Sequence, residues 1–444
     1  MNETRLAAAI DALGRADLHR RRGRVTNLIG LVIEATGLAA EIGEVCEIAT
    51  GRNGATIPSE VVGFRDGRTL LMPLGPLDGI GPGKSVTAPG HSFRLPVGDG
   101  LLGRVLDGLG RPLDGKPEPM GEAVASTIAA PPSPLSRTPI DTRLELGVRA
   151  LDAFVPVGLG QRLGIFAGSG VGKSSLLGMI ARSTSADVNV ICLVGERGRE
   201  VREFVERDLG PALERSVVIT ATSDEPALVR VKAAFAATTV AEHFRDRGQN
   251  VLLMMDSVTR FAMAQREIGL AIGEPPATRG FTPSVFALLP QLLERAGTSE
   301  RGSITGLYTV LVEGDDMNEP IADAARSILD GHCVLTRELA HRNHYPAIDV
   351  LQSVSRLATS IVGPDVLAAA GKVRERLAVH KQNEDLITVG AYQRGSDPRV
   401  DDAIEHVPAI ESFLRQGLDE HVPLDEVDHG VLQLGASPPA LIAA

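Results

Sequence analysis

The chain has 444 residues, a length that predicts two to four domains and excludes a small module held together by disulfides or a metal. Its 45 lysines and arginines stand against 56 aspartates and glutamates, a net charge of -11, and 43% of its residues are hydrophobic. This balance excludes a disordered chain and indicates an acidic globular protein. With only 3% aromatic residues and no tryptophan, the chain has little on which single-stranded nucleic acid could stack, so we expect no nucleic-acid partner.

Cysteine usage and hydropathy bear on the compartment. The three cysteines, Cys46, Cys192 and Cys333, are widely spaced and form neither a disulfide framework nor a metal knuckle. The N-terminal sequence lacks the apolar core and cleavage site of a secretion signal, and no stretch of about 18 apolar residues follows. These features predict a cytoplasmic protein.

Residues 1–24 form the first predicted element, an N-terminal arm for partner binding. Leu6, Ile10 and Leu13 share one face of an amphipathic helix expected over residues 2–18, which ends in the basic run 19–24. Packing of this helix on its own protein and docking of a partner helix are equally compatible with the pattern. The basic run is near the lower limit for contact with acidic lipid.

Three further domains follow along the chain. Residues 25–95 hold short β-rich runs separated by Gly and Pro turns, which predict a small β-barrel. Over residues 96–360 apolar runs alternate with helical stretches, as in a parallel sheet with crossover helices. Residues 361–444 show helical periodicity with charged faces and predict a helical C-terminal domain. The predicted fold class is therefore α/β.

Residues 162–177, RLGIFAGSGVGKSSLL, read as a buried strand, a Gly-rich turn and the start of a helix, which is the context of a P-loop. Glycines let backbone N–H groups converge on phosphate oxygens, Lys173 reaches the β- and γ-phosphates, and Ser174 is a ligand for Mg²⁺. Ala167 stands where the common pattern has its first glycine, a small change at the strand exit. We expect ATP and magnesium to bind a RecA-like core through Gly168, Ser169, Gly170, Val171, Gly172, Lys173, Ser174 and Ser175.

Two acidic residues end other apolar runs. NVLLMMD ends at Asp256, and a P-loop protein needs an acidic residue near its magnesium at such a strand end. The alternative is that Asp256 caps the helix expected at 257–272. VNVICLVGERGRE ends at Glu196, which parallel strands would bring to the P-loop edge, where it can face the γ-phosphate beside Arg197. The alternative there is a surface Glu-Arg pair in a helix-capping turn.

Read in order, these motifs and several others resemble the catalytic subunits of hexameric rotary-type ATPases, most closely the flagellum-specific export ATPases of the type III secretion group. The resemblance covers about residues 25 to 435. The segment 345–356, YPAIDVLQSVSR, has the form of the family signature. The other specific motifs are 100–115, 166–174, 194–204, 266–297 and 303–339.

This resemblance implies roles for individual residues. Lys173 and Ser174 would hold the phosphates and magnesium, and Asp256 would orient the magnesium through water. Glu196 would activate the attacking water, and Arg197 would sense the γ-phosphate.

Further roles follow from the same resemblance. Arg260 would support the phosphate edge, and Arg356 would reach the nucleotide site of the neighbouring subunit. Tyr345 would stack on adenine. Leu418 stands where synthase catalytic subunits have a phenylalanine, which puts the strength of adenine stacking in question.

The function implied is Mg²⁺-dependent hydrolysis of ATP by a homo-oligomeric ring, most simply a hexamer, that energises flagellar protein export. The implied partners are regulatory and stalk proteins of the export apparatus, export substrates and chaperones, and peripherally the membrane export gate, at the inner face of the cytoplasmic membrane. An injectisome ATPase shares every catalytic motif and stays open. A nucleic-acid motor is disfavoured by composition, and an inactive subunit by Glu196, since non-catalytic synthase subunits carry Gln there.

Overall fold

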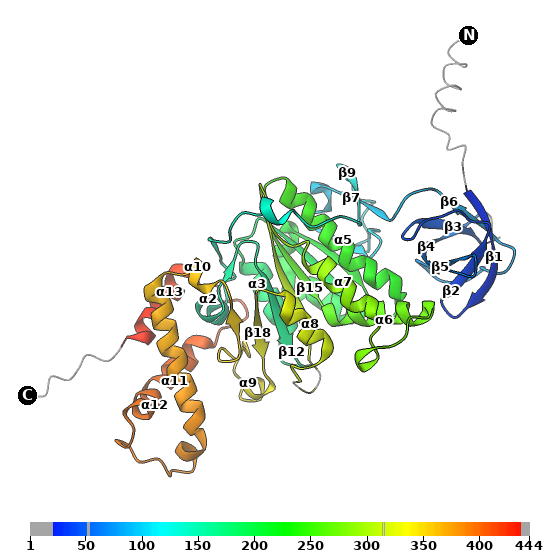
Figure 1. Ribbon diagram of the computed structural model, residues 1–444. Helices are drawn as coiled ribbons and strands as arrows, with labels where there is room; N and C mark the ends of the chain where they lie inside the picture. Colours follow the sequence, from blue (N-terminus) through cyan, green and yellow to red (C-terminus); the bar gives the residue numbers. More distant parts are fainter. Residues whose placement is uncertain (1–20, 51–53, 313, 315, 437–444) are drawn as a thin grey trace, which may run out of the picture. The chain divides into compact units, whose positions relative to one another are not determined.

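The computed structural model describes residues 21–50, 54–312, 314 and 316–436, and the expected N-terminal helix lies outside them. The described chain forms two compact units, one comprising the first 94 residues together with 268–274 and the other the rest. Figure 1 labels the elements. No helix among the described residues is both long and apolar enough to cross a bilayer.

The first unit is a closed β-barrel with strand order β1-β2-β5-β4-β3-β6. Its core is built from inward-facing apolar residues such as Ile33, Ile48 and Leu71, all fully buried. Asp66 and Gly67, both with positive φ, make the tight β4–β5 hairpin turn. The strands are β1 (Arg21–Ile29), β2 (Val32–Thr36), β3 (Val45–Ala49), β4 (Thr56–Arg65), β5 (Arg68–Pro73) and β6 (Ser85–Ala88).

The barrel begins before the boundary predicted at residue 25. Residues 21–24, which the sequence analysis placed in the basic N-terminal arm, lie in β1 and pair with β6 from Arg21–Ala88 to Arg24–Ser85. Their arginines are exposed while Val25 is buried. A charged run is therefore compatible with a strand when its side chains face solvent.

The second unit centres on a mostly parallel sheet in the order β19-β18-β12-β17-β15-β13-β14-β8, with β16 antiparallel on β17. The strands are β8 (Arg104–Asp107), β12 (Arg162–Ala167), β13 (Val188–Val194), β14 (Ser216–Ala221), β15 (Asn250–Asp256), β16 (Gly297–Thr298), β17 (Ser303–Leu311), β18 (Gly331–Leu335) and β19 (Val354–Ser355). Two small sheets pair β7 (Arg94–Val97) with β9 (Ala123–Ser126) and β10 (Arg143–Leu144) with β11 (Val157–Gly158). This confirms the predicted α/β class.

Helices cover this sheet, as Figure 1 shows. α5 packs on β13 to β15, and α8 packs on β17 and β12. The short helix α4 after β13 is followed directly by a π-helical segment at Phe204–Leu209. The helices are α2 (Arg149–Phe154), α3 (Lys173–Ser183), α4 (Gly198–Glu203), α5 (Ala227–Asp246), α6 (Val258–Ile272), α7 (Pro283–Leu293), α8 (Pro320–Ile328), α9 (Arg337–His341) and α10 (Ala358–Ile361).

The C-terminal helices are α11 (Pro364–Thr388), α12 (Pro398–Leu414) and α13 (Leu424–Gly435), drawn orange to red in Figure 1. Val373, Ile410 and Val431 are buried between them and extend the core of the sheet domain. Arg376 is also buried and pairs with Asp402 at 2.8 Å. The helical domain is thus continuous in packing with the nucleotide-binding core.

Candidate active site

The Gly-rich turn joins β12 to α3 at the centre of the sheet. β12 lies between β17 and β18, ends at Ala167, and is followed by α3 from Lys173. Gly170 and Gly172 have φ of 78° and 86°, in the left-handed region that favours glycine. Ala167 is buried in the core, so its methyl group does not enter the loop. The substitution of Ala for the first glycine therefore leaves the turn intact.

A cavity of about 580 Å³ opens over this turn. Of the predicted phosphate-binding residues only Val171 does not line it, because its side chain is buried in the core. The lining also includes residues from the loops after β13 and β14 and from α4, α6 and β17, which are distant in sequence from the turn. It consists of Gly168, Ser169, Gly170, Gly172, Lys173, Ser174, Ser175, Gly195, Glu196, Arg197, Glu200, Ser223, Arg260 and Leu311.

Three charged side chains meet at the base of the cavity. The Lys173 ammonium donates a short hydrogen bond to Asp256 Oδ1 and lies 3.6 Å from Glu196 Oε1. Thr309 on β17 donates to the same Asp256 oxygen at 2.7 Å. Because β12, β13, β15 and β17 are parallel, their carboxyl ends bring these groups to one edge. The sequence did not predict a role for Thr309. It is a lone hydroxyl residue within an apolar strand, which is only a weak indication of a functional site.

The charges act on each other through their pKa values. Burial raises the pKa of Glu196 to about 7, and the charge of Asp256 adds to this against the opposing effect of Lys173. Burial lowers the pKa of Lys173, but the charges of Asp256 and Glu196 outweigh it and raise this pKa overall. Lys173 is therefore charged at neutral pH, whereas Glu196 exchanges its proton near neutrality. A general base works best with such a pKa.

The alternative for Asp256, a helix cap, does not match the contacts. The backbone N–H of Arg260 donates to the Ser257 hydroxyl at 3.3 Å, so Ser257 caps α6. The stem of Arg260 packs on Gly195, where a Cβ would lie 3.0 Å from the Arg260 Cβ. Arg260 thus lines the cavity from α6.

Arg197 has the features of the alternative prediction, in which it is a surface residue in a helix-capping turn. It occupies the N-cap position of α4, its side chain is 79% exposed, and its guanidinium pairs with Glu200 at 3.4 Å. It lies at the rim of the cavity and, among the described residues, forms no ion pair with Asp256. Glu196, its neighbour in sequence, points inward to Lys173 instead.

Tyr345 lies over the start of α3. A Cβ at Gly172 would be 3.5 Å from the Tyr345 ring, which is partly exposed. The backbone N–H of Gln416 donates to the Tyr345 carbonyl at 3.0 Å, so the helical domain holds the residue that carries the ring. Leu418 is exposed two residues later. These positions leave an aromatic ring available to a base.

Gln416 is a residue that the sequence analysis missed. Its buried side chain accepts a hydrogen bond from the Arg149 N–H at 2.8 Å and donates to the carbonyls of Gly147 and Glu420, each at 2.8 Å. These bonds join the loop before α2 to the segment after α12. A single amide in a charged helical tail gives no sequence signal of this.

Arg356 lies away from the P-loop of its own chain. It follows β19, which is antiparallel to β18, and its N–H donates to the Asp330 carbonyl at 3.0 Å. The Asp330 N–H in turn donates to the carbonyl of Arg162 at 2.8 Å. Arg356 is therefore level with the first residue of β12, roughly 16 Å along the strands from Ala167. Its side chain is exposed.

The residues present fit a nucleotide and a magnesium ion. The Ser174 hydroxyl is exposed and makes no hydrogen bond within the described chain, and Asp256 supplies carboxylate oxygen nearby. The described residues contain no group of three or more His, Cys, Asp or Glu side chains that would hold a metal alone. Such a donor set suits magnesium, which keeps waters and takes phosphate oxygens as ligands.

A Gly-rich strand-to-helix turn with a lysine, together with carboxylates at neighbouring strand ends, defines a P-loop nucleotide-binding site. Comparison with known families agrees with this class. Residues 147–355 match the nucleotide-binding domain of the ATP synthase alpha/beta family, 25–90 match its beta-barrel domain, and 362–430 match the T3SS EscN ATPase C-terminal domain.

Individual proteins are similar over nearly the whole chain. A flagellum-specific ATP synthase of Bacillus subtilis is 57% identical, covering 94% of this chain and 96% of its own. A type 3 secretion system ATPase of Xanthomonas euvesicatoria is 52% identical, covering 90% and 91%. The structure of the assembled ATPase EscN in complex with its central stalk EscO, from enteropathogenic E. coli, has a TM-score of 0.86 at 46% identity, covering 93% and 100%. The chain belongs to the ATP synthase alpha/beta family, as an ATPase with a type III secretion C-terminal domain.

Proposed function

We propose that this protein is a Mg²⁺-dependent ATPase that works as a homo-oligomeric ring, most simply a hexamer, in flagellar protein export. One observation is the main support for an oligomeric ring. The cavity contains Glu196, the candidate base, whereas the exposed Arg356 of the same chain lies roughly 16 Å away along the sheet. An arginine so placed can complete only the site of another copy. The EscN relative, at 46% identity, is assembled.

The residues of the cavity supply the steps of hydrolysis. Lys173 binds the β- and γ-phosphates, and Glu196 takes a proton from water as the water oxygen bonds to the γ-phosphorus and the bond to the β-phosphate oxygen breaks. Arg356 of a neighbouring copy stabilises the charge that develops on the γ-phosphoryl group, and Arg197 senses that group from the rim. Ser174 would hold a magnesium ion and Asp256 would act on it through water, and the ion would neutralise phosphate charge when bound.

The partners follow from the similarity to export ATPases. The EscN relative binds a central stalk, and we propose an equivalent stalk protein here, together with regulatory proteins, chaperones and export substrates. The proposed location is cytoplasmic, peripheral at the inner face of the membrane beside the export gate. Residues 1–20, the part of the predicted arm that precedes β1, remain the proposed binding arm for a regulator.

Injectisome export is the second candidate, favoured by the match of residues 362–430 to the EscN C-terminal domain. The flagellar relative is the more similar of the two reported, at 57% against 52% identity. Deletion in the native organism separates them. Loss of flagellar filaments, restored by the unaltered gene but not by Glu196→Gln, supports flagellar export, whereas intact filaments contradict it.

The shared site is tested by mixing two inactive variants, Lys173→Ala and Arg356→Ala. At equal proportions about a quarter of interfaces in a ring pair an intact P-loop with an intact arginine, so hydrolysis should recover towards a quarter of the unaltered rate. Assembly of both variants is verified by mass, and each variant alone is the control. Absence of recovery in assembled mixed rings would contradict a shared site.

A further inference from the structure

The segment that ends in Arg356 is held by a specific set of hydrogen bonds. We call residues 349–356 the arginine segment. The Asp349 carboxylate accepts the N–H groups of Leu351 and Gln352 at 2.9 and 3.1 Å. The Ser353 hydroxyl donates to the Asp349 carbonyl at 2.6 Å, and that of Ser355 donates to the Pro156 carbonyl at 2.7 Å. The segment is thus a folded turn and not a free loop.

One arginine of the helical domain binds this turn. The Arg374 guanidinium on α11 donates to the carbonyl of Val350, to that of Ser353 at 3.2 Å and to that of Phe154 at 2.5 Å. No carboxylate of the described residues lies within ion-pair distance of it, unlike the neighbouring Arg376, which pairs with Asp402. Burial lowers the pKa of Arg374. A partly buried guanidinium that bonds to carbonyls without a carboxylate in contact loses hydration, and the charge of Asp349 offsets only part of the effect on its pKa, so its use here calls for a reason other than stability.

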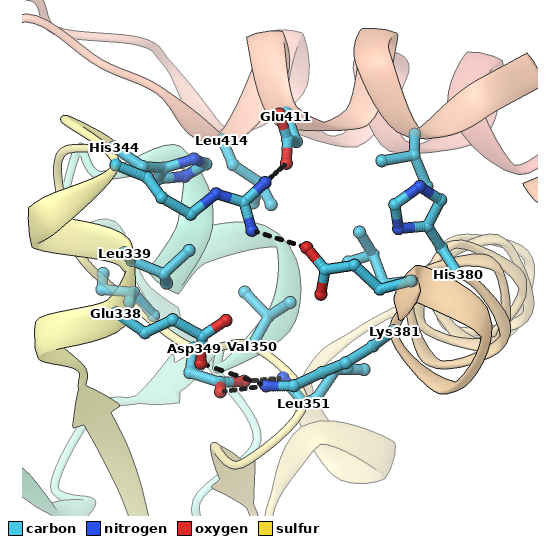
Figure 2. A pocket seen from close by; sticks show the side chains of 15 residues that line it. Glu338, Leu339, His344, Asp349, Val350, Leu351, His380, Lys381, Glu411 and Leu414 are labelled. Carbon is cyan, nitrogen blue, oxygen red and sulfur yellow. Dashed lines mark hydrogen bonds and ion pairs between the residues drawn. The ribbon is translucent and has the colours of Figure 1, made fainter. Parts of the chain in front are cut away.

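A second contact joins the same two elements one heptad along α11. Lys381 lies 3.6 Å from Asp349 Oδ2 and 3.8 Å from Glu338. Arg374 and Lys381 are seven residues apart and so share one face of the helix. Figure 2 shows Lys381 reaching from α11 to Asp349 and Glu338 across a pocket. The arginine segment therefore rests against α11 at two points.

The opposite wall of that pocket is also bridged by charge. Arg342, which follows α9, pairs with Glu411 on α12 at 3.1 Å and with Glu384 on α11 at 3.5 Å. Beyond it, the N–H of Gln416 holds the carbonyl of Tyr345. The helical domain thus contacts both the ring offered to a base and the segment that ends in Arg356.

We propose that Arg374 is a positioning residue for Arg356, so that the helical domain of one copy sets the geometry of the arginine delivered to the next. The inference rests on the proposed shared site. Ser353, whose carbonyl Arg374 binds, is three residues before Arg356. After Ser353 the segment pairs with β18 at Val354 and Ser355, and the Arg356 N–H donates to the Asp330 carbonyl. Loss of the Arg374 bonds therefore frees the turn that precedes this pairing, and we expect it to shift the position of Arg356.

The expected effect follows from the sensitivity of catalysis to position. A transition-state arginine contributes ~10³–10⁵ to turnover, and a 1 Å misplacement costs about 10²-fold. Arg374→Met removes every donor while keeping an apolar stem over Phe154. Its kcat should fall about 10²-fold, with nucleotide affinity changed by less than about threefold, because Arg374 contacts no residue that lines the cavity over the P-loop.

Two further variants separate positioning from stability and from charge. Arg374→Lys keeps the charge, but one ammonium cannot bond three carbonyls arranged around a planar fork, so kcat should stay low. Arg376→Met is the matched control on the same helix. It removes a buried ion pair that does not touch the arginine segment, so it should lower Tm at least as much while leaving kcat within about threefold at a temperature where the chain is folded.

The decisive experiment mixes Arg374→Met with Lys173→Ala in assembled rings. The Lys173→Ala chain brings an intact Arg374 and Arg356, so hydrolysis should recover to the same extent as in the Arg356→Ala mixture. If the Arg356→Ala mixture recovers and the Arg374→Met mixture does not, Arg374 acts within its own site and the inference is wrong while the shared site stands. If neither recovers, the shared site fails and the inference fails with it.

Discussion

Replacing Glu196 by Gln separates the chemistry of the site from its affinity. The side chain is 17% exposed and lies 3.6 Å from Lys173, facing the cavity over the P-loop. Gln keeps the shape but cannot accept a proton. A positioned base contributes ~10²–10⁴-fold, so kcat should fall by that factor. Affinity for ATP should remain close to that of the unaltered chain, since the change removes a negative charge near the phosphates.

The pH dependence of kcat/KM provides a second, independent test of the role of Glu196. Burial and Asp256 raise the pKa of Glu196 to about 7 in the nucleotide-free protein. The base is then about one-eleventh ionised at pH 6 and ten-elevenths at pH 8, so kcat/KM, which reports the free enzyme, should rise about tenfold between them. The rise occurs because the acidic form cannot take the proton from water. Glu196→Gln should show no such rise.

Both expectations are tested by measuring steady-state ATPase activity from pH 5.5 to 8.5. Equilibrium binding of a fluorescent ATP analogue is measured at each pH. Glu200→Gln is the matched control, because Glu200 lines the same cavity and raises the pKa of Glu196. It should keep most of the turnover and shift the midpoint to lower pH. Turnover of Glu196→Gln within threefold of the unaltered chain, or an unchanged pH profile in that variant, would remove Glu196 from the mechanism.

Tyr345→Ala should weaken ATP affinity by about 5–150-fold, because stacking of an aromatic ring on a base contributes ~1–3 kcal/mol. Tyr345→Phe keeps the ring and should bind ATP as the unaltered chain does. Equal affinities in the two variants would contradict stacking. Gln416→Leu leaves three backbone groups without their partner, the buried Gly147 carbonyl and the partly buried Arg149 N–H and Glu420 carbonyl. It should lower the free energy of unfolding in urea by about 1–3 kcal/mol, and an unchanged midpoint would refute this. Burial raises the pKa of Asp152 to about 7, so unfolding free energy should fall as pH rises from about 4 through 7, by on the order of 4 kcal/mol. Asp152→Asn should lose that slope, and an equal slope in both chains would show that Asp152 is not its source.

The sequence predicted the P-loop and the strand-end carboxylates because each depends on local order. A buried strand, a glycine turn and a lysine at fixed spacing leave the backbone few conformations, and parallel strands carry Glu196 and Asp256 to the same edge. The local order of residues did not predict which side chains Glu196 and Asp256 would contact. The pattern allowed Asp256 either to lie near the magnesium or to cap the following helix. The Ser257 contact with Arg260 shows that Ser257 is the cap, and Asp256 contacts Lys173 instead.

Contacts between segments distant in sequence were beyond prediction for the same reason. Gln416 bonds to Gly147 and Arg149, more than 260 positions away. The basic residues 21–24 were assigned to an arm because charge suggested an exposed terminus, yet strand pairing with β6 decides their structure. A strand can carry charged residues when their side chains face solvent, so the exposure expected for a residue does not tell whether it lies in a strand.

Charge on a helix was the least reliable signal, and α11 shows why. Its sequence places Arg374 and Arg376 among the charged residues of a predicted helix, but Arg376 is buried and Arg374 bonds to three carbonyls. A planar guanidinium carries donors enough for several carbonyls at once, so arginine can bond the backbone of a neighbouring turn at several points, whereas Lys381 reaches the same turn through the Asp349 carboxylate. Arg215 does the same, donating to carbonyls at the end of α3 and just beyond it. An arginine in a charged helix of this chain is therefore as much a candidate for holding one element against another as for facing water.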